Sequence, residues 1–591
     1  MDIISMKCAP LSAVDTMIDI MLRSRKSLGR RLSRLMKSAL TSIGLICLLV
    51  ACAPSEETIN RAEDSQTIAS VDADAKGSVV DHEKTLDFEG EMERAVKALD
   101  ATGLLAAAII DGEIVFKGTK GKSNENTGAP IDTDMVFPIG SISKAFTTTA
   151  LAILVDRGQV EWDEPLRTYI PEFKMADDWI TDHFTVRDAV THRSGLPLGA
   201  GDLLFWPDAT STIDDFIAAM PHLPQAYGFR AKYAYDNLLY SIAGEVVARV
   251  SGKSWADFVS DEIMTPLDLD GCAANLSKVP VSKAIVTGHE RAAGASVGTP
   301  ISDSMRLKEV VDAAGGVYCS LDGIMAWAQF WLNDGESATG VRIVSEEQID
   351  ELLSPVIPIA ADKILGKSGL VNLTNYALGW FIRDFNGTKL VEHAGGVAGV
   401  GTRLFLFPDK QMAFFAITND YRSTGSAWVY QMADDAIGGR EVDFIKALGD
   451  RQNERTTKAL TQLDDALAPP EDAIPPSLPL SAYAGVYRDP WYGLVSVTEE
   501  EGGLLMDMKR SNLLTGPLSH YDGETFSALW PNRTLRGDAF VTFELSTDDP
   551  NAEGSDSPAA EKTVIGIKMK AISEFTDFSF DFHDLDLKRV N

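Results

Sequence analysis

A serine and a lysine three residues apart, Ser141 and Lys144, have the clearest potential for nucleophilic chemistry in this chain. Both stand at the start of FPIGSISKAFTTTALAILVDRG (137–158), where apolar residues recur with helical spacing until Gly158. Residues i and i+3 share a helix face. Burial lowers a lysine pKa, so that the amine can accept a hydroxyl proton, and helix N-terminal N–H groups favour a developing negative charge. The pattern therefore predicts that Ser141 is an activated nucleophile.

A second candidate pair, Tyr235 and Asn237, stands directly before another apolar helical segment in AKYAYDNLLYSIAGEVVARVSG (231–252). A tyrosine hydroxyl near a lysine can relay a proton between a nucleophile and a leaving group. The amide of Asn237 can bind a substrate carbonyl and also contact the lysine. Taken alone, Tyr-x-Asn is better explained as an aromatic residue and a helix cap at the end of a loop.

The third segment, LVEHAGGVAGVGTRLFLFPDKQMAFFAITND (390–420), begins near His393 and is rich in glycine. We predict a glycine-rich turn at His393, followed by two strands that meet at Pro408-Asp409. Glycine allows a substrate to approach the backbone closely, and a strand edge there can hydrogen-bond an extended peptide. The alternative is a tight hairpin with an incidental histidine.

In this order, Ser-x-x-Lys, Tyr-x-Asn and a basic residue followed by x-Gly resemble the superfamily of serine beta-lactamases and penicillin-binding proteins. The likeness covers about residues 88–440 and is closest to the class C branch, which includes D-aminopeptidases, D,D-carboxypeptidase-like enzymes and esterases. Supporting segments are VRDAVTHRSGLP (186–197), DAAGGVYCS (312–320) and YALGW (376–380). The resemblance implies an α+β domain, with an antiparallel sheet flanked by helices plus a helical lobe, and a mechanism without a metal or organic cofactor.

The resemblance also assigns roles. Ser141 is the acylated nucleophile, Lys144 its general base and Tyr235 the proton relay, and Asn237 contacts the substrate. The backbone N–H groups of Ser141 and Gly396 form an oxyanion hole, and such donors typically contribute roughly 10²–10³ in rate.

The third motif departs from most lactamases, which carry Lys-Thr/Ser-Gly where this chain has His393-Ala394-Gly395. The charge of a histidine depends on pH, and Ala394 lacks the hydroxyl that helps to bind a carboxylate. The departure favours D-amino-acid peptidases and esterases. Lys367-Ser368-Gly369 matches the lactamase motif more literally, but it precedes YALGW, whereas the family's motif follows that segment. We therefore prefer His393–Gly395.

The predicted activity is hydrolysis of a D-amino-acid peptide, a peptidoglycan fragment or a carboxylic ester through a Ser141 ester. The alternatives are a true class C-type beta-lactamase, an envelope receptor that senses beta-lactams or muropeptides without turnover, and a structural envelope protein.

A formal net charge of −32 disfavours nucleic-acid binding. No Cys/His cluster has metal-ligand spacing, so we predict no metal site, and Cys272 and Cys319 could pair in an oxidising compartment. The sequence does not indicate an oligomeric state.

Residues 1–52 have the pattern of a lipoprotein signal peptide, with Met21 as a candidate start. A basic stretch precedes the apolar run Ala39–Ala51, which is shorter than the about 20 residues that span a bilayer. Leu49-Val50-Ala51-Cys52 resembles a bacterial lipobox, in which Cys52 is lipidated; an ordinary signal peptide or a buried helix is the alternative. We expect a lipid anchor in the cell envelope, facing the periplasm, with the outer membrane favoured.

The acidic composition of segment 53–85 predicts a flexible tether. The resemblance assigns residues 86–440 to the hydrolase domain. Residues 441–477 predict a helical connector followed by a proline-rich linker. Period-2 alternation over 478–591 predicts an antiparallel barrel of about eight strands, and LSAYAGVY resembles the opening of a lipocalin-like domain. Its role, packing or shaping substrate access, stays open, and 548–561 is a predicted loop.

Overall fold

The computed structural model describes residues 86–291, 297–360, 369–420, 422–438, 442–546 and 562–590. The predicted signal peptide, tether and loop 548–561 lie outside these ranges, as do Lys367 and Ser368 of the rival motif. Within the described ranges, no helix combines the length and the apolar character needed to cross a membrane.

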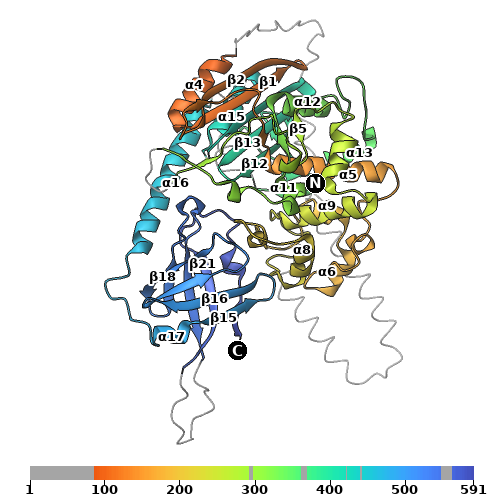
Figure 1. Ribbon diagram of the computed structural model, residues 1–591. Coiled ribbons are helices and arrows are strands. Elements are labelled where there is room, and N and C mark those ends of the chain that lie inside the picture. Colours follow the sequence, from red (N-terminus) through yellow and green to blue (C-terminus); the bar gives the residue numbers. More distant parts are fainter. Residues whose placement is uncertain are drawn as a thin grey trace, which may run out of the picture. The chain divides into compact units, whose positions relative to one another are not determined.

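A nine-stranded antiparallel sheet forms the centre of the first domain (Figure 1), in the order β3-β2-β1-β14-β13-β12-β11-β10-β9. Strand β1 (Gly103–Ile110) pairs with β14 (Met412–Thr418), so the two ends of the domain's sequence meet in the middle of the sheet. A tight turn joins β1 to the next strand, where Asp111 and Gly112 both have positive φ. The other strands are β2 (Glu113–Asn124), β3 (Ala129–Pro130), β9 (Ile357–Ile359), β10 (Thr374–Tyr376), β11 (Phe381–Phe385), β12 (Thr388–Val397) and β13 (Val400–Phe407).

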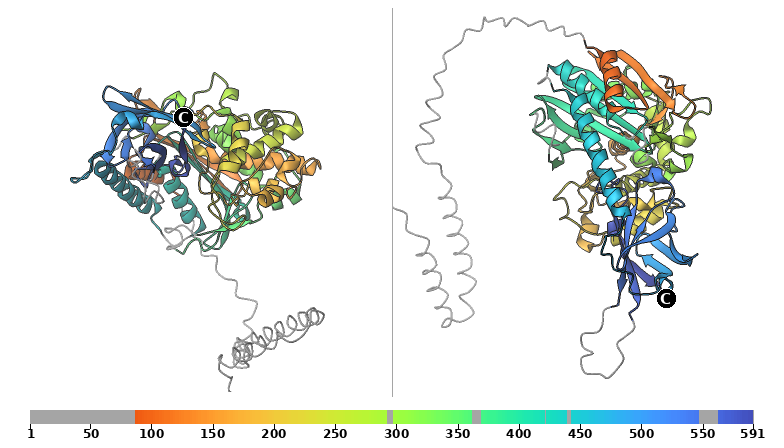
Figure 2. Two further views of the ribbon diagram at one scale, coloured as in Figure 1. Left: turned by 90° about the horizontal axis from the view of Figure 1, so that it is seen from below. Right: turned by 90° about the vertical axis from the view of Figure 1, so that its left-hand side faces the viewer.

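Helices cover both faces of this sheet. Helices α4 (Phe88–Leu99), α15 (Thr424–Ile437) and α16 (Phe444–Leu467) pack together, and the right-hand view of Figure 2 shows α4 in orange beside α16 in cyan. Helices α5 (Ser143–Asp156) and α12 (Leu321–Leu332) belong to the core of the opposite face.

Strand β1 shows why both faces need cover. Its sequence GLLAAAII is apolar throughout, and its residues are buried except for Ile110, which is partly exposed. Alternate side chains point to opposite faces of a strand. Leu104 and Ala106 therefore join the core under α4 and α15, whereas Leu105 and Ala107 join the core that contains α5 and α12.

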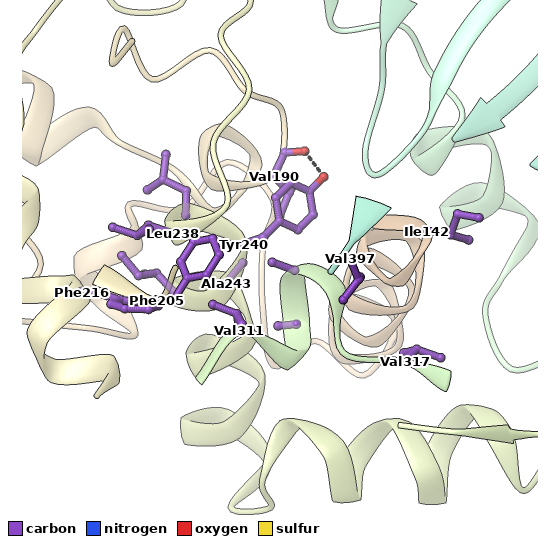
Figure 3. Packing of buried hydrophobic residues seen from close by; sticks show 14 of the residues in the cluster. Ile142, Val190, Phe205, Phe216, Leu238, Tyr240, Ala243, Val311, Val317 and Val397 are labelled. Carbon is purple, nitrogen blue, oxygen red and sulfur yellow. Dashed lines mark hydrogen bonds between the residues drawn. The ribbon is translucent and has the colours of Figure 1, made fainter. Parts of the chain in front are cut away.

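The helical lobe packs around α9 (Leu238–Ser251), the helix predicted after Asn237. Figure 3 shows Leu238, Tyr240 and Ala243 of this helix among the buried apolar side chains, and the Tyr240 hydroxyl donates a hydrogen bond to the Val190 carbonyl oxygen at 2.6 Å. The other helices of the lobe are α6 (Asp178–His183), α7 (Val186–Ala189), α8 (Ile213–Ala219) and α10 (Trp255–Val259).

A disulfide joins Cys272 to Cys319, a pairing that the sequence left open. The two cysteines are directly opposite each other in neighbouring strands, β5 (Cys272–Ala273) and β8 (Tyr318–Cys319). Strand β8 also pairs with β4 (Phe137–Pro138), which leads into the Ser141 segment. The bridge thus lies one strand away from the candidate nucleophile.

The C-terminal domain is a closed barrel of eight antiparallel strands connected in sequence order. This confirms the barrel prediction, and the alternation on which it rested is visible: Tyr487, Val495 and Val497 are buried, whereas Val486 and Leu494 are exposed. The predicted helical connector corresponds to α16. The strands are β15 (Gly485–Asp489), β16 (Gly493–Glu500), β17 (Gly503–Asp507), β18 (Thr515–Asp522), β19 (Thr525–Ala528), β20 (Ala539–Leu545), β21 (Val564–Ala571) and β22 (Leu587–Val590).

One local prediction is wrong. His393 does not head a turn, because His393–Val397 form the end of strand β12, with Gly395 opposite Thr402 and Gly396 opposite Gly401 in β13. Extended glycines can pair in a sheet as other residues do. The turn comes two residues later, where Gly399 has a φ of +71°.

Candidate active site

Ser141 lies in a single 3-10 turn, Gly140–Ile142, that continues directly into α5. The preceding Gly140 has a φ of +55°, a conformation that favours glycine. A Cβ atom on Gly140 would lie 2.8 Å from the Gly396 nitrogen and 3.0 Å from the Gly395 Cα. The turn that carries Ser141 is therefore packed directly against the end of strand β12.

Lys144, one turn further on, is fully buried. Its Nζ atom lies 3.1 Å from Ser141 Oγ, 2.8 Å from Asn237 Oδ1 and 2.9 Å from the Ala314 carbonyl oxygen. Burial lowers the pKa of Lys144 to about 7, although the nearby Asp202 and Asp236 raise it in part. The amine is therefore available in its neutral form near neutral pH.

Tyr235 completes the surroundings of Ser141. Its ring centroid lies 4.6 Å from Lys144 Nζ, and it lines the same cavity as Ser141. Burial raises the Tyr235 pKa above its ordinary value of 10. The phenol thus keeps its proton at neutral pH, and Lys144 rather than Tyr235 is the group that can take a proton from Ser141.

Asn237 connects Lys144 to a carboxyl group that the sequence did not indicate. The Asn237 Nδ2 atom donates a hydrogen bond to Asp202 Oδ2 at 2.9 Å, and the hydroxyl of Ser579 donates to the same oxygen at 2.8 Å. Asp202 is buried, which raises its pKa well above the ordinary range. It begins a short 3-10 helix, Asp202–Leu204, directly after Gly201, and no motif in the sequence marks it.

The C-terminal barrel domain also binds the segment Gly201–Leu203, which contains Asp202. Asp581 accepts hydrogen bonds from the backbone N–H groups of Gly201, at 2.6 Å, and of Leu203, at 3.2 Å. Asp581 is fully buried, and its pKa is raised well above the ordinary range by burial first and then by Asp202. The C-terminal domain therefore touches the hydrogen-bond chain that leads to Lys144.

His393 lies on strand β12 and is almost fully buried. Its Nδ1 atom lies 2.6 Å from the Ala394 carbonyl oxygen, which can only accept, so Nδ1 carries the proton. Its Nε2 atom, 3.3 Å from the Tyr376 hydroxyl, is then an acceptor. Burial, helped by the charge of Lys144, lowers the pKa of His393 to about 3. His393 is therefore a neutral imidazole except at strongly acidic pH.

His192 is a second histidine that sequence reasoning missed, although its segment VRDAVTHRSGLP was noted. It is buried, its ring centroid lies 4.2 Å from that of Tyr235, and its Nδ1 atom accepts the backbone N–H of Asp236 at 3.1 Å. The imidazole supports both the Tyr235 ring and the chain that precedes Asn237.

Gly395 and Gly396 differ sharply in the space around them. A Cβ atom on Gly395 would lie 2.0 Å from the Ile139 carbonyl oxygen and 2.4 Å from Thr402 Oγ1, whereas a Cβ atom on Gly396 would meet nothing within 4 Å. Gly395 is thus required for close packing of β12 against the segment before Ser141. Gly396 presents its backbone to open space.

A cavity of about 930 Å³ brings the predicted residues together. Six of the site residues predicted from the sequence line this cavity, and Lys144 is fully buried beside Ser141. Residues of α16 and of the barrel segment 575–580 form further parts of the wall, and the Phe578 ring centroid lies 6.1 Å from that of Tyr235. The lining residues predicted from the sequence are Ser141, Tyr235, Asn237, His393, Gly395 and Gly396.

Comparisons with known proteins show which families the two domains are similar to. The family model described as Beta-lactamase matches residues 90–434, and a model described as a domain of unknown function (DUF3471) matches residues 469–589. Unguisins hydrolase ungD' of Aspergillus campestris is 27% identical over 432 residues, which cover 69% of this chain and 77% of that protein. The D-alanyl-D-alanine-carboxypeptidase/endopeptidase AmpH of Escherichia coli K12 is 24% identical over 332 residues, which cover 54% and 79%.

The fold is shared with a solved structure, the octameric penicillin-binding protein homologue from Pyrococcus abyssi. The TM-score is 0.52 at 19% identity, over 77% of this chain and 96% of that one. The first family model spans more than half of the 591 residues. With its sheet, its helical lobe and the motif residues gathered in one cavity, the chain belongs to the beta-lactamase family of hydrolases and carries a closed eight-stranded barrel at its C-terminal end.

Proposed function

We propose that the chain is a serine hydrolase that forms an acyl-enzyme on Ser141, with Lys144 as the general base and Tyr235 as the proton relay. The observation that carries the proposal is the set of hydrogen-bond partners around Lys144 Nζ. Asn237 Oδ1 and the Ala314 carbonyl oxygen can only accept hydrogen bonds. A neutral amine gives its two hydrogens to these oxygens and aims its lone pair at the Ser141 hydroxyl.

The reaction follows from this arrangement. Ser141 Oγ attacks the substrate carbonyl carbon and its proton passes to Lys144, while the backbone N–H groups of Ser141 and Gly396 hold the oxyanion. Collapse of the intermediate breaks the bond to the leaving group, which takes a proton through the Tyr235 hydroxyl. Water then attacks the ester, gives up its proton along the same groups, and releases the acid with Ser141 restored.

For the substrate, we propose a D-amino-acid peptide, a peptidoglycan fragment or a carboxylic ester. His393 is neutral and Ala394 has no hydroxyl, so this edge of the cavity lacks the cation and the hydroxyl that a Lys-Thr/Ser-Gly motif supplies. Efficient beta-lactam hydrolysis is correspondingly less favoured. Strand β12 borders the cavity with backbone that can pair with an extended peptide, and the names of two relatives, a carboxypeptidase/endopeptidase and an unguisins hydrolase, agree with an acyl substrate of this kind.

The test uses the purified protein with a chromogenic cephalosporin, a short-chain nitrophenyl ester and a D-alanyl nitroanilide. We expect turnover of the ester or the anilide, and a loss of at least ~10³-fold in Ser141→Ala and Lys144→Met. Melting curves of both variants show whether they are folded. Equal turnover by wild type and folded Ser141→Ala would refute the proposal, and a stable Ser141 adduct without turnover would establish the sensor alternative instead.

We also propose that Cys52 carries a lipid anchor that holds the enzyme in the cell envelope. The support is the lipobox-like sequence Leu49-Val50-Ala51-Cys52 after a basic and apolar leader. Incorporation of a labelled fatty acid into the wild-type chain, and none into Cys52→Ala, is the expected result. Labelling of the variant would place any lipid elsewhere.

A further inference from the structure

Part of the cavity lining is cationic. Four arginines line the cavity, and three of them, Arg451, Arg455 and Arg536, come from outside the hydrolase domain. Arg451 and Arg455 belong to α16, and Arg536 follows a short helical turn of the barrel domain. This concentration of positive charge stands in a chain with a formal net charge of −32.

Helix α16 presents one face to the cavity. Phe444, Leu448, Gln452 and Thr456 line the cavity together with the two arginines, at the i, i+4 and i+7 spacings of a single helix face. The apolar residues belong to the first part of the helix, and the arginines come one to three turns later. The cavity therefore changes along α16 from an apolar to a cationic lining.

The guanidinium groups differ in their partners. Arg536 forms an ion pair with the buried Glu290 at 3.1 Å, and the Arg455 guanidinium lies 5.4 Å from the centroid of the Phe575 ring. The pKa of Arg455 is lowered by burial and by the charges of Arg451 and Arg536. These arginines are thus close enough to repel one another. Asp577 and Glu290 also line the cavity, and Glu290 is the carboxylate that pairs with Arg536.

We propose that Arg455 and Arg536, assisted by Arg451, form a subsite for a carboxylate that the substrate carries away from its reacting carbonyl. Guanidinium groups bind carboxylates through paired, charge-assisted hydrogen bonds, and an anion between them relieves their mutual repulsion. The inference rests on the proposed function and narrows it to anionic acyl chains or peptides. A cavity of about 930 Å³ has room for a substrate that reaches from Ser141 to these arginines.

A series of substrates of increasing length, each made with and without a carboxylate, tests the subsite. Peptidyl nitrophenyl esters with one to four D-alanine residues are made in two forms, N-succinyl with a carboxylate and N-succinamoyl with a neutral amide. At one or more lengths we expect the wild type to prefer the succinyl ester by about tenfold in kcat/KM at low salt, because a charge-assisted contact is lost in the amide. Added salt should reduce the preference.

In the double variant Arg455→Ala/Arg536→Ala the ratio of kcat/KM for the succinyl ester to kcat/KM for the succinamoyl ester should fall to about twofold or less. Lys458→Ala is the control, since Lys458 lies on the same helix, is exposed and does not line the cavity. Absence of a preference at every length, or a preference that survives in the double variant, would overturn the subsite.

A second measurement separates this inference from the proposed function. Binding of the succinyl and succinamoyl peptide amides to folded Ser141→Ala protein is measured by calorimetry, where no turnover is needed. Tighter binding of the succinyl form, abolished by the two arginine substitutions, supports the subsite even if no ester is hydrolysed. Ester turnover together with equal binding of the succinyl and succinamoyl peptides would support the proposed hydrolase function and refute the carboxylate subsite.

Discussion

Replacing Gly395 by alanine tests whether the end of β12 positions the catalytic groups. The added Cβ would lie 2.0 Å from the Ile139 carbonyl oxygen and 2.4 Å from Thr402 Oγ1. Ile139 is itself fixed, because its N–H donates to the Val317 carbonyl oxygen at 2.9 Å and its own carbonyl accepts from Thr402 at 2.9 Å. The strand must therefore move away from the Ser141 turn.

The expected cost has two parts. Overpacking a tightly packed site destabilises a protein by typically 1–3 kcal/mol, and the lost Thr402 hydrogen bond contributes about 1 kcal/mol more. A shift of β12 also moves the Gly396 N–H away from the oxyanion, and loss of one such donor costs roughly 10²–10³ in kcat. We expect Gly395→Ala to be less stable by about 2–4 kcal/mol and at least ~10²-fold less active.

Gly401→Ala is the matched control in the same hairpin. Gly401 pairs with Gly396, does not line the cavity, and a Cβ atom there would meet only atoms at 3.8 Å and beyond. Ester turnover and urea unfolding of both variants are compared with the wild type. If Gly395→Ala keeps wild-type kcat, or if Gly401→Ala loses as much, the end of β12 is not the wall that positions the oxyanion site.

Three further predictions follow from the geometry. The kcat/KM of the wild type for a neutral ester should fall about tenfold per pH unit below pH 7, since Lys144 is protonated there; a flat profile between pH 5 and 7 would contradict its role as base. Ser579→Ala removes one of two donors to Asp202, which in turn accepts from Asn237, a partner of Lys144, so kcat should fall roughly threefold to tenfold; an unchanged kcat would mean that Ser579 serves packing alone. Reduction of the disulfide between Cys272 and Cys319, which are 47 residues apart, should destabilise the protein by about 4 kcal/mol, whereas a Cys272→Ser/Cys319→Ser variant should melt at the same temperature with or without reductant.

The sequence by itself determined the local elements and the identity of the motif residues. Periodic apolar residues predicted the helices after Ser141 and Asn237 and the eight strands of the barrel, and all are present. Such patterns succeed because helix and strand periodicity depends on residues close together in the chain. The turn at His393 was predicted wrongly because glycine permits both a turn and an extended strand, and the pairing partner β13 decided between them.

Only the tertiary structure decided how these residues act on one another. Lys144 meets the Asn237 side chain across 93 residues of sequence and the Ala314 carbonyl across 170, and Ser579 reaches Asp202 across 377. Burial and neighbours from distant segments lower the pKa of Lys144 and keep His393 neutral. Distant segments also bring Arg451, Arg455 and Arg536 to the cavity. Burial is a property of the packed chain, and no spacing of residues along the sequence encodes it directly.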